Sequence, residues 1–177
     1  MLIGLIIILL VVLVTAIIVG WSFFVLWRTG VPFVTMRRYE NEFVLNSLDI
    51  KPGQTFLDLG CGDGRLLKML ADKYQINGTG YELNIWAYWR AKLKTWHYPN
   101  IRIYYGDYLK ADWSSFDYIF TYAMPGMMTR IQGRLVKERI KNCTFATYAF
   151  RLPSIEPTHL HYRDIDKRRG GLYIYLL

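Results

Sequence analysis

Cysteine is scarce in this chain, and acidic residues are fewer than basic ones. The 177 residues include two cysteines, Cys61 and Cys143, which lie far apart and give no disulfide framework. We expect both to be reduced thiols in a cytosolic domain. There are 14 Asp and Glu against 22 Lys and Arg, so the formal charge is +8. Such a balance favours an anionic membrane surface, an acidic partner or nucleic acid.

Charge is absent from residues 2–27. The hydrocarbon core of a bilayer takes about 20 helical residues, so this run is long enough to span it. A cleaved signal peptide is the alternative, but it normally has a basic start, a shorter apolar core and a small-x-small cleavage site, which the run lacks. The sequence therefore predicts a transmembrane anchor over residues 1–27.

The basic residues nearest to the anchor, Arg28, Arg37 and Arg38, all follow it, and no Lys or Arg precedes it. The positive-inside rule then predicts a single-pass membrane protein whose remaining residues lie on the cytoplasmic side. A lipid bilayer contacted through residues 2–27 is thus the expected partner of this end of the chain. Because the N-terminus supplies a membrane, the basic composition requires no nucleic acid, and none is expected as a partner.

Residues 28–54 are predicted to be an entry segment, with extended chain around Pro32 and a short helix in YENEFVLNSLDI. From residue 55 onward, helical runs alternate with five strand-like runs: TFLDLG, GTGYEL, IRIYYGD, FDYIFTYA and CTFATYAF. This alternation indicates an α/β domain with a parallel, doubly wound sheet over residues 55–177. Two further alternating runs, THLHYRDI and GLYIYLL, flank the turn-like DKRRGG and predict a C-terminal antiparallel hairpin.

The helical run NIWAYWRAKLKTW carries four aromatic and three basic residues. We expect Trp86 and Trp89 to pack against the sheet, while Arg90, Lys92 and Lys94 form a solvated face. A role at the membrane surface is the alternative interpretation of this mixture.

A glycine-rich loop follows the first strand, in FLDLGCGDGR. Its spacing is G-x-G-x-G, whereas a pyrophosphate-binding loop has G-x-G-x-x-G. Asp58 and Asp63 bracket the glycines, and two carboxylates would repel a phosphate. Carboxylates suit a ligand that carries positive charge and hydroxyl groups. The predicted ligand-binding residues of this stretch are Asp58, Gly60, Cys61, Gly62, Asp63 and Gly64.

Further acids follow the next two strands. Glu82 ends the second strand, where a carboxylate can accept both ribose hydroxyls, and Asp107 follows the third strand, where it can meet an adenine amino group. Tyr108 could pack on the base. In open α/β sheets, ligands bind beyond the carboxyl ends of the strands, so these side chains should converge. S-adenosylmethionine fits, because it has an ammonium, a sulfonium and a ribose but no phosphate. Asp58 would receive the ammonium.

The stretches FLDLGCGDGR, GYELN, YYGDY and FDYIFTY resemble, in order and spacing, the motifs of the seven-strand S-adenosylmethionine-dependent methyltransferases. The resemblance implies a Rossmann-like seven-strand sheet that ends in the antiparallel hairpin, and it adds Leu83 and Asn84 to the cofactor site. Residues 31–177 more closely resemble the membrane-anchored protein-lysine methyltransferases of the adenine nucleotide translocase and ATP synthase c-subunit. The motifs carrying this second resemblance are VPFV, DLGCGDGR, GYELNIWAYWRAK, MPGMM and FRLP.

This second resemblance implies methylation of a lysine of a protein substrate, and a membrane protein is a candidate for that substrate. A lysine must lose its proton before it accepts a methyl group, and a desolvating aromatic channel favours the neutral amine. Tyr122 follows the fourth strand as a channel wall or hydrogen-bond acceptor, Pro125 shapes the same loop, and Phe33 would cover the site. We predict these three as the catalytic-site residues.

Other functions stay open at this stage. The methyl acceptor could instead be a lipid or quinone headgroup, or the chain could be a non-catalytic cofactor-binding membrane module. A nicotinamide-dependent oxidoreductase is a more distant alternative. Cys61 is interpreted as a small residue in the loop, with a catalytic thiol as the alternative. His159 and His161 share a strand face but lack a third ligand, so no metal is expected.

Overall fold

The computed structural model describes residues 2–29, 35–164, 166 and 169–177. The chain divides into two compact units, Met1–Phe33 and Val34–Leu177. Each unit is treated separately below, beginning with the N-terminal helix.

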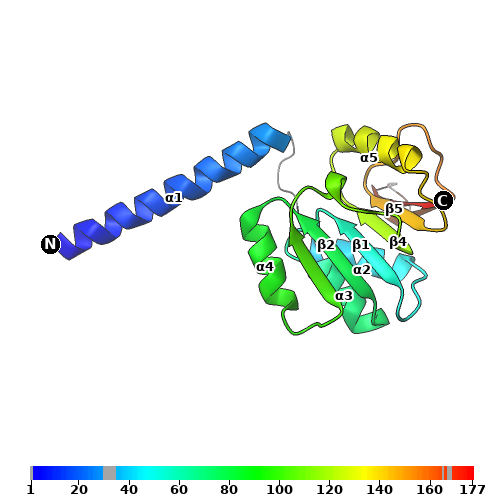
Figure 1. The fold of residues 1–177 in the computed structure, drawn as a ribbon, viewed down its shortest axis with the longest axis horizontal. Coiled ribbons are helices and arrows are strands. Elements are labelled where there is room, and N and C mark those ends of the chain that lie inside the picture. The colour runs from blue at the N-terminus through cyan, green and yellow to red at the C-terminus, as the bar shows by residue number, and fades with distance from the viewer. Residues whose placement is uncertain (1, 30–34, 165, 167–168) are drawn as a thin grey trace. The chain divides into compact units, whose positions relative to one another are not determined.

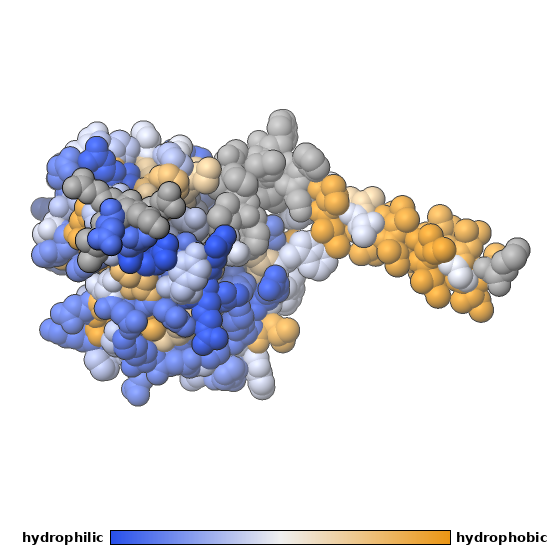
Figure 2. All heavy atoms as spheres, turned by 180° about the vertical axis from the view of Figure 1, so that it is seen from behind, coloured by the Kyte–Doolittle hydropathy of each residue, from blue (hydrophilic) through white to orange (hydrophobic). Residues whose placement is uncertain are grey.

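Helix α1 spans Leu2–Thr29, and its Leu2–Trp21 part has a mean hydropathy of 3.5. Figure 2 shows apolar side chains along this helix, in contrast to the largely hydrophilic face of the second unit. The hydroxyl of Thr15 donates to the carbonyls of Val11 and Val12, both at 2.9 Å, so it is satisfied within the helix. The helix is long and apolar enough to cross a bilayer, a property that a transmembrane span and a signal sequence share.

The second unit is built on a seven-stranded sheet with the order β3-β2-β1-β4-β5-β7-β6 (Figure 1). The strands are β1 Thr55–Leu59, β2 Asn77–Glu82, β3 Ile101–Tyr105, β4 Tyr118–Thr121, β5 Thr144–Tyr148, β6 His159–Asp164 and β7 Arg169–Leu176. The first five strands pair in parallel, and β7 is antiparallel to both β5 and β6. The predicted α/β fold class with its C-terminal hairpin is therefore confirmed, and the hairpin joins the sheet through β7.

Helices fill most of the connections between the strands (Figure 1). The connecting helices are α3 Arg65–Tyr74, α4 Ile85–Thr95 and α5 Pro125–Lys137, with a short 3-10 helix, η1, at Tyr108–Lys110, whereas α2 Arg38–Ser47 precedes β1. The central strand β1 is buried along Phe56–Leu59, as expected for a parallel strand covered on both faces. Helix α3 turns Leu66, Leu67 and Leu70 into the same core. The sheet and α3 thus hold the end of β1 in a rigid position.

The buried side of helix α4 consists of small side chains, which contradicts the prediction that its tryptophans pack against the sheet. Its buried residues are Ala87, Ala91 and Thr95, whereas Trp86 and Trp89 are 49% and 59% exposed. The expectation that these two tryptophans pack against the sheet is wrong. The reason is the tight contact with the glycine loop, where a Cβ on Gly64 would lie 3.0 Å from the Ala91 Cβ.

The basic residues of α4 also differ from the prediction in one case. Arg90 and Lys92 are exposed, as expected. The Lys94 ammonium instead lies 2.5 Å from the Asp63 carboxylate, with 28% of its side chain exposed. The prediction of a fully solvated basic face is therefore wrong for Lys94, because the glycine loop brings Asp63 within reach of the helix.

We predict that Gly64→Ala destabilises the fold more than Gly53→Ala does. Both glycines have positive φ, at 71° and 83°, but Gly53 has open space around it. The left-handed backbone should cost each alanine variant about 1–2 kcal/mol. Overpacking against Ala91 should cost Gly64→Ala about 1–3 kcal/mol more. Denaturant unfolding of the full chain in detergent measures both, and equal losses would show that the contact with Ala91 is unimportant.

Candidate active site

The glycine loop joins the end of β1 to the start of α3 and is anchored to β2. Gly60, Gly62 and Gly64 all have positive φ, a region that glycine enters without a Cβ penalty. The backbone N–H groups of Gly60 and Cys61 both donate to the Tyr81 carbonyl, at 3.0 and 2.9 Å. These bonds hold the loop against the carboxyl end of the sheet.

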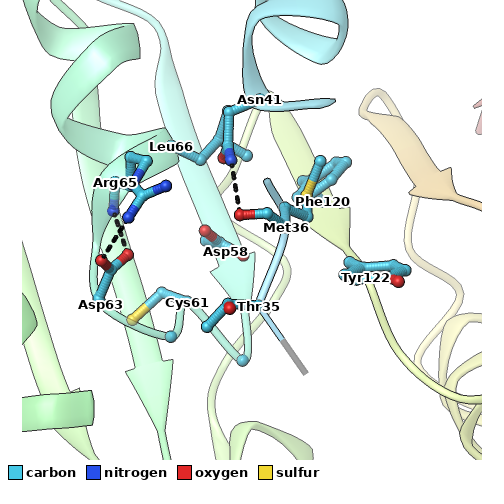
Figure 3. A pocket seen from close by; sticks show the side chains of 12 residues that line it. Thr35, Met36, Asn41, Asp58, Cys61, Asp63, Arg65, Leu66, Phe120 and Tyr122 are labelled. Atoms are coloured by element: carbon cyan, nitrogen blue, oxygen red, sulfur yellow. Dashed lines mark hydrogen bonds and ion pairs between the residues drawn. The ribbon is translucent and has the colours of Figure 1, made fainter. Parts of the chain in front are cut away.

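Asp58 is the most unusual residue of this region. It lies within β1, is 4% exposed and lines the pocket beside the loop (Figure 3). Burial raises the pKa of Asp58 to about 8, and the nearby Glu82 charge acts in the same direction. Among the described residues, no hydrogen-bond donor offsets these two effects. The carboxyl group is therefore poised to meet a cationic group in the pocket.

Glu82, the last residue of β2, is built into the loop itself. Its Oε2 accepts a hydrogen bond from the Gly62 N–H at 2.9 Å, and its Oε1 accepts one from the Asn84 N–H at 2.7 Å. Burial raises the pKa of Glu82 above its ordinary value, although these hydrogen bonds act in the opposite direction. The Leu83 N–H also acts on this carboxylate, which with about four lone-pair sites keeps capacity for a hydroxyl donor.

Asp63 has protein partners on both of its oxygens. Oδ2 lies 2.5 Å from Lys94 and 3.2 Å from Arg65, and Oδ1 accepts a hydrogen bond from the Arg65 N–H at 3.3 Å. Burial acts to raise the pKa of Asp63, but the Lys94 and Arg65 contacts hold it below its ordinary value. Asp63 thus fastens the loop to α4, a role that the sequence pattern did not indicate.

Two other predicted residues cap helices. The Asn84 side chain accepts from the N–H groups of Trp86 and Ala87, at 3.0 and 3.1 Å, and so forms the N-cap of α4. Asp107 accepts from the Leu109 N–H at 2.9 Å and caps η1. These caps fix the ends of α4 and η1 at the edge of the sheet.

Tyr108 stands beside the glycine loop, with Cε1 of its ring 4.0 Å from a Cβ built on Gly60. Burial raises the pKa of Tyr108 to about 12, with a further contribution from Asp107. Leu83 is half-buried and follows directly after Glu82. Both residues therefore lie close to the carboxyl end of β2.

The pocket contains about 400 Å³ of open space. The predicted residues that line it are Asp58, Gly60, Cys61, Gly62, Asp63 and Tyr122. The lining residues that sequence reasoning missed are Thr35, Met36, Asn41, Arg65, Leu66 and Phe120. The other described candidates are not part of this lining: Gly64, Glu82, Leu83, Asn84, Asp107, Tyr108 and Pro125. Phe33 lies outside the described residues.

The segment before α2 covers one side of the pocket. The buried Asn41 donates from Nδ2 to the carbonyls of Met36 and Arg37, at 3.3 and 2.8 Å (Figure 3 draws the first). The methyl group of Thr35 lies 3.9 Å from a Cβ built on Gly62. Glu40 accepts a hydrogen bond from the Arg37 N–H at 2.6 Å and so fixes the start of α2. Because Arg37 is not a Ser or Thr, the sequence pattern indicated neither this role of Glu40 nor the role of Asn41.

Tyr122 lines the pocket on the side away from the glycine loop, and other aromatic side chains surround it (Figure 3 shows Tyr122). The Tyr122 ring meets the Tyr148 ring edge-on, with 5.5 Å between the ring centroids. The ring centroid of Phe43 lies 6.3 Å from that of Tyr148. The Tyr148 hydroxyl lies 3.4 Å from a carboxylate oxygen of Glu40. Burial raises the pKa of Tyr122, and the Glu40 charge adds to this effect. Tyr122 thus lines the pocket itself, whereas Tyr148 and Glu40 lie behind it and outside the lining.

Cys61 is buried, and burial raises the pKa of its thiol well above the ordinary value. The neighbouring Asp58 and Glu82 charges act in the same direction. A reactive cysteine needs the thiolate, so these conditions favour the small-residue interpretation over a catalytic thiol.

We predict that Asp58→Asn changes how stability depends on pH. The folded-state pKa of Asp58, about 8, lies above the ordinary value of 3.8. Stability from this group is therefore fully present below about pH 4 and is lost as the pH rises toward 8. Between these limits, the variant should gain stability over the native chain by up to about 1.4 kcal/mol per pH unit. Unfolding of the cofactor-free chain from about pH 5 to pH 8 measures this.

Asp112→Asn is the control for this experiment. Asp112 is exposed, and hydrogen bonds from Ser114 lower its pKa. Its contribution to stability is therefore lost only as the pH falls below about 4, so the control should follow the native chain over the tested range. Identical pH slopes for Asp58→Asn and the native chain would contradict the raised pKa.

Known proteins resemble this chain in sequence and in structure. Residues 58–159 match the family described as ANTKMT methyltransferase domain. The human ATP synthase c-subunit lysine N-methyltransferase is 27% identical over 142 residues, which cover 78% of this chain and 60% of the human protein. The Xenopus laevis protein of the same name is also 27% identical, over 76% of this chain and 60% of its own length. The chain thus spans about 60% of the length of these relatives.

Solved structures confirm the fold. An RNA methyltransferase from Salinibacter ruber, in complex with S-adenosyl-L-homocysteine, gives a TM-score of 0.72 at 19% identity, covering 80% of this chain and 92% of that one. A SAM-dependent methyltransferase from Thiobacillus denitrificans gives 0.55 at 18% identity, covering 68% and 53%. At these identities the likeness concerns the fold alone, while the family match covers more than half of the chain. The chain therefore belongs to the ANTKMT methyltransferase domain family of class I S-adenosylmethionine-dependent methyltransferases.

Proposed function

We propose that the protein transfers a methyl group from S-adenosylmethionine to a lysine side chain of a protein at a membrane. One observation carries the proposal: the buried Asp58 carboxyl faces a pocket whose opposite wall includes Tyr122. An acid on one side suits a cationic cofactor, and an aromatic wall on the other suits an amine acceptor. The relatives that are 27% identical, named as lysine N-methyltransferases of the ATP synthase c-subunit, support lysine as the acceptor.

The residues at the end of β1 fit the amino-acid end of the cofactor. Asp58 would hold the ammonium, because a nearby cation favours the ionised form of a carboxyl whose pKa burial has raised. Gly60 and Gly62 leave the loop backbone open to close approach. When bound, the cofactor supplies an electrophilic methyl group on its sulfonium.

The residues after β2 and β3 fit the nucleoside end. Glu82 would accept the ribose hydroxyls on the lone pairs that Gly62 and Asn84 leave free. Asp107 would meet the adenine amino group, and Tyr108 would pack on the base. Leu83 and Asn84 complete this part of the proposed cofactor site.

The aromatic wall would receive the lysine. The ring of Tyr122, which lines the pocket, would present a face that suits a cation or a neutral amine, and the buried Tyr148 would hold that ring in place. The Glu40 charge, which acts on Tyr122, would attract an incoming ammonium. A lysine with an ordinary pKa of about 10.4 must release its proton before it reacts, and desolvation beside these rings favours that loss. Holding amine and methyl donor in line can lower the barrier by about 7–11 kcal/mol. Pro125, the first residue of α5, and Phe33 remain proposed contributors to this side of the site.

Helix α1 would anchor the enzyme as a single span, with the methyltransferase domain in the cytoplasm. The support is the run of uncharged residues, followed by Arg28, Arg37 and Arg38. In this arrangement residues 1–27 are the anchor, 28–54 the entry segment and 55–177 the catalytic domain. The substrate would then be a membrane protein or a basic protein close to the bilayer.

A labelling experiment tests the acceptor class. The full chain is incubated with host membranes and S-adenosylmethionine carrying a labelled methyl group, and products are mapped by mass spectrometry. We expect label on lysine, and no label when Asp58→Asn replaces the native chain. Label found only in lipid or quinone would overturn the lysine assignment, and label that persists with Asp58→Asn would overturn the cofactor site.

We predict that Tyr122→Ala lowers kcat/KM for the protein substrate by about 10–100-fold, because positioning of the amine is lost. Cofactor affinity should change by less than about threefold, since Tyr122 lies on the acceptor wall. Tyr122→Phe separates two roles: retained activity indicates a channel wall, and a loss equal to that of alanine indicates the hydroxyl. Tyr173→Phe is the control. Leu172 of β7 pairs with Tyr148, and Tyr173, the next residue, points to the other face of the sheet. Unchanged kcat/KM for Tyr122→Ala would refute the assigned wall.

A further inference from the structure

Helix α4 and its C-cap carry an exposed aromatic surface that the proposed function does not use. Its members, called here the α4 stripe, are Trp86, Trp89, Leu93 and Trp96, with exposures of 49%, 59%, 75% and 78%. Their spacing of three, four and three residues places them on one side of the helix. The opposite side is the buried face of Ala87, Ala91 and Thr95.

The α4 stripe continues toward the edge of the sheet where the cofactor site lies. The Tyr88 ring packs edge-on against Trp89, with 5.2 Å between the ring centroids. It also contacts Tyr105 on the edge strand β3, where the centroids are 5.6 Å apart. Tyr105 is itself 46% exposed. Contiguous exposed apolar surface of this kind marks a binding surface rather than ordinary solvent-facing residues.

Positive charge borders the stripe. Arg90 and Lys92 of α4 are exposed, as is Arg102 on β3. The helix sequence IWAYWRAKLKT contains no acidic residue. Lys94 does not contribute to this border, because Asp63 pairs with it. Tryptophan and leucine flanked by arginine and lysine are typical of helices that lie in the headgroup layer of anionic membranes.

We propose that the α4 stripe docks on the surface of an anionic lipid bilayer. The chain itself favours this occupant, because α1 is long and apolar enough to cross a membrane. Helix α1 ends at Thr29 and α2 begins at Arg38, so the two units are joined by a short stretch of the chain. A bilayer that held α1 would keep the methyltransferase domain tethered to the membrane, and the basic border complements anionic headgroups.

Docking through α4 would set the height of the active site above the membrane. The helix starts at its cap, Asn84, two residues after Glu82, so its first turn is fixed to the proposed cofactor site. A bilayer contact along the stripe would hold the carboxyl edge of the sheet at a constant distance from lipid. This contact is independent of which acceptor the enzyme methylates.

A nitroxide probe in the full chain tests the docking. Leu93→Cys places the probe in the stripe, and Val136→Cys on α5, where the native side chain is 63% exposed, is the matched control. Both are reconstituted in phosphatidylcholine vesicles that contain phosphatidylglycerol. Oxygen concentrates in hydrocarbon, whereas a nickel chelate stays in water. We expect the ratio of oxygen to nickel collisions to be about threefold higher at position 93 than at 136. The native chain, with buried Cys61 and Cys143, controls for background labelling.

Charge reversal tests the lipid class. Arg90→Glu with Lys92→Glu should lower the ratio at position 93 toward the control, as should vesicles without phosphatidylglycerol. Lys137→Glu with Lys141→Glu, two exposed positions at the end of α5 and beyond, should leave it unchanged. Equal ratios at positions 93 and 136 would overturn the proposal. Spectral broadening that disappears on dilution with unlabelled chain would also overturn it, because a second copy would then cover the stripe.

Discussion

The burial of one carboxyl group, that of Asp58, is the constraint on which the arrangement of this site depends. A buried acid raises the free energy of the folded chain unless it is protonated or paired, and its pKa of about 8 reflects this cost. The adjacent loop must bring backbone close to the same point, which requires glycines with positive φ. Hydrogen bonds from the loop to Tyr81 and Glu82 keep that backbone in position. The fold thus retains an unfavourable group where a cationic ligand can compensate it.

The same loop determines the outer surface of the domain. Gly64 lies so close to Ala91 that α4 can present only small residues on its inner side. The large residues of this helix are consequently on its outer side, and there they form the α4 stripe. Lys94 completes the contact by pairing with Asp63. The position of α4 therefore determines both its packing against the glycine loop and the exposure of the α4 stripe that we propose contacts the membrane.

The sequence alone predicted the sheet, the hairpin and the loop, because their signals are local: alternating strand and helix patterns, glycine spacing and acids at strand ends. Contacts between distant residues were not predictable in this way. Lys94 meets Asp63 across 31 positions. Asn41 lies on the helical side that faces the pocket, yet its hydrogen bonds to Met36 and Arg37 depend on the path of the entry segment. The tryptophans of α4 misled the prediction, since aromatic residues on a helix usually face a core.

Proton release on cofactor binding tests the central claim, that Asp58 receives a cation. Calorimetric titration with S-adenosylmethionine at about pH 7, in buffers of different ionisation enthalpy, counts the protons released. Because Asp58 is mostly protonated below its pKa of about 8, ionisation on binding should release about one proton in the native chain. The Asp58→Asn chain should release none in any binding that remains. Binding by the native chain without proton release would contradict the assignment.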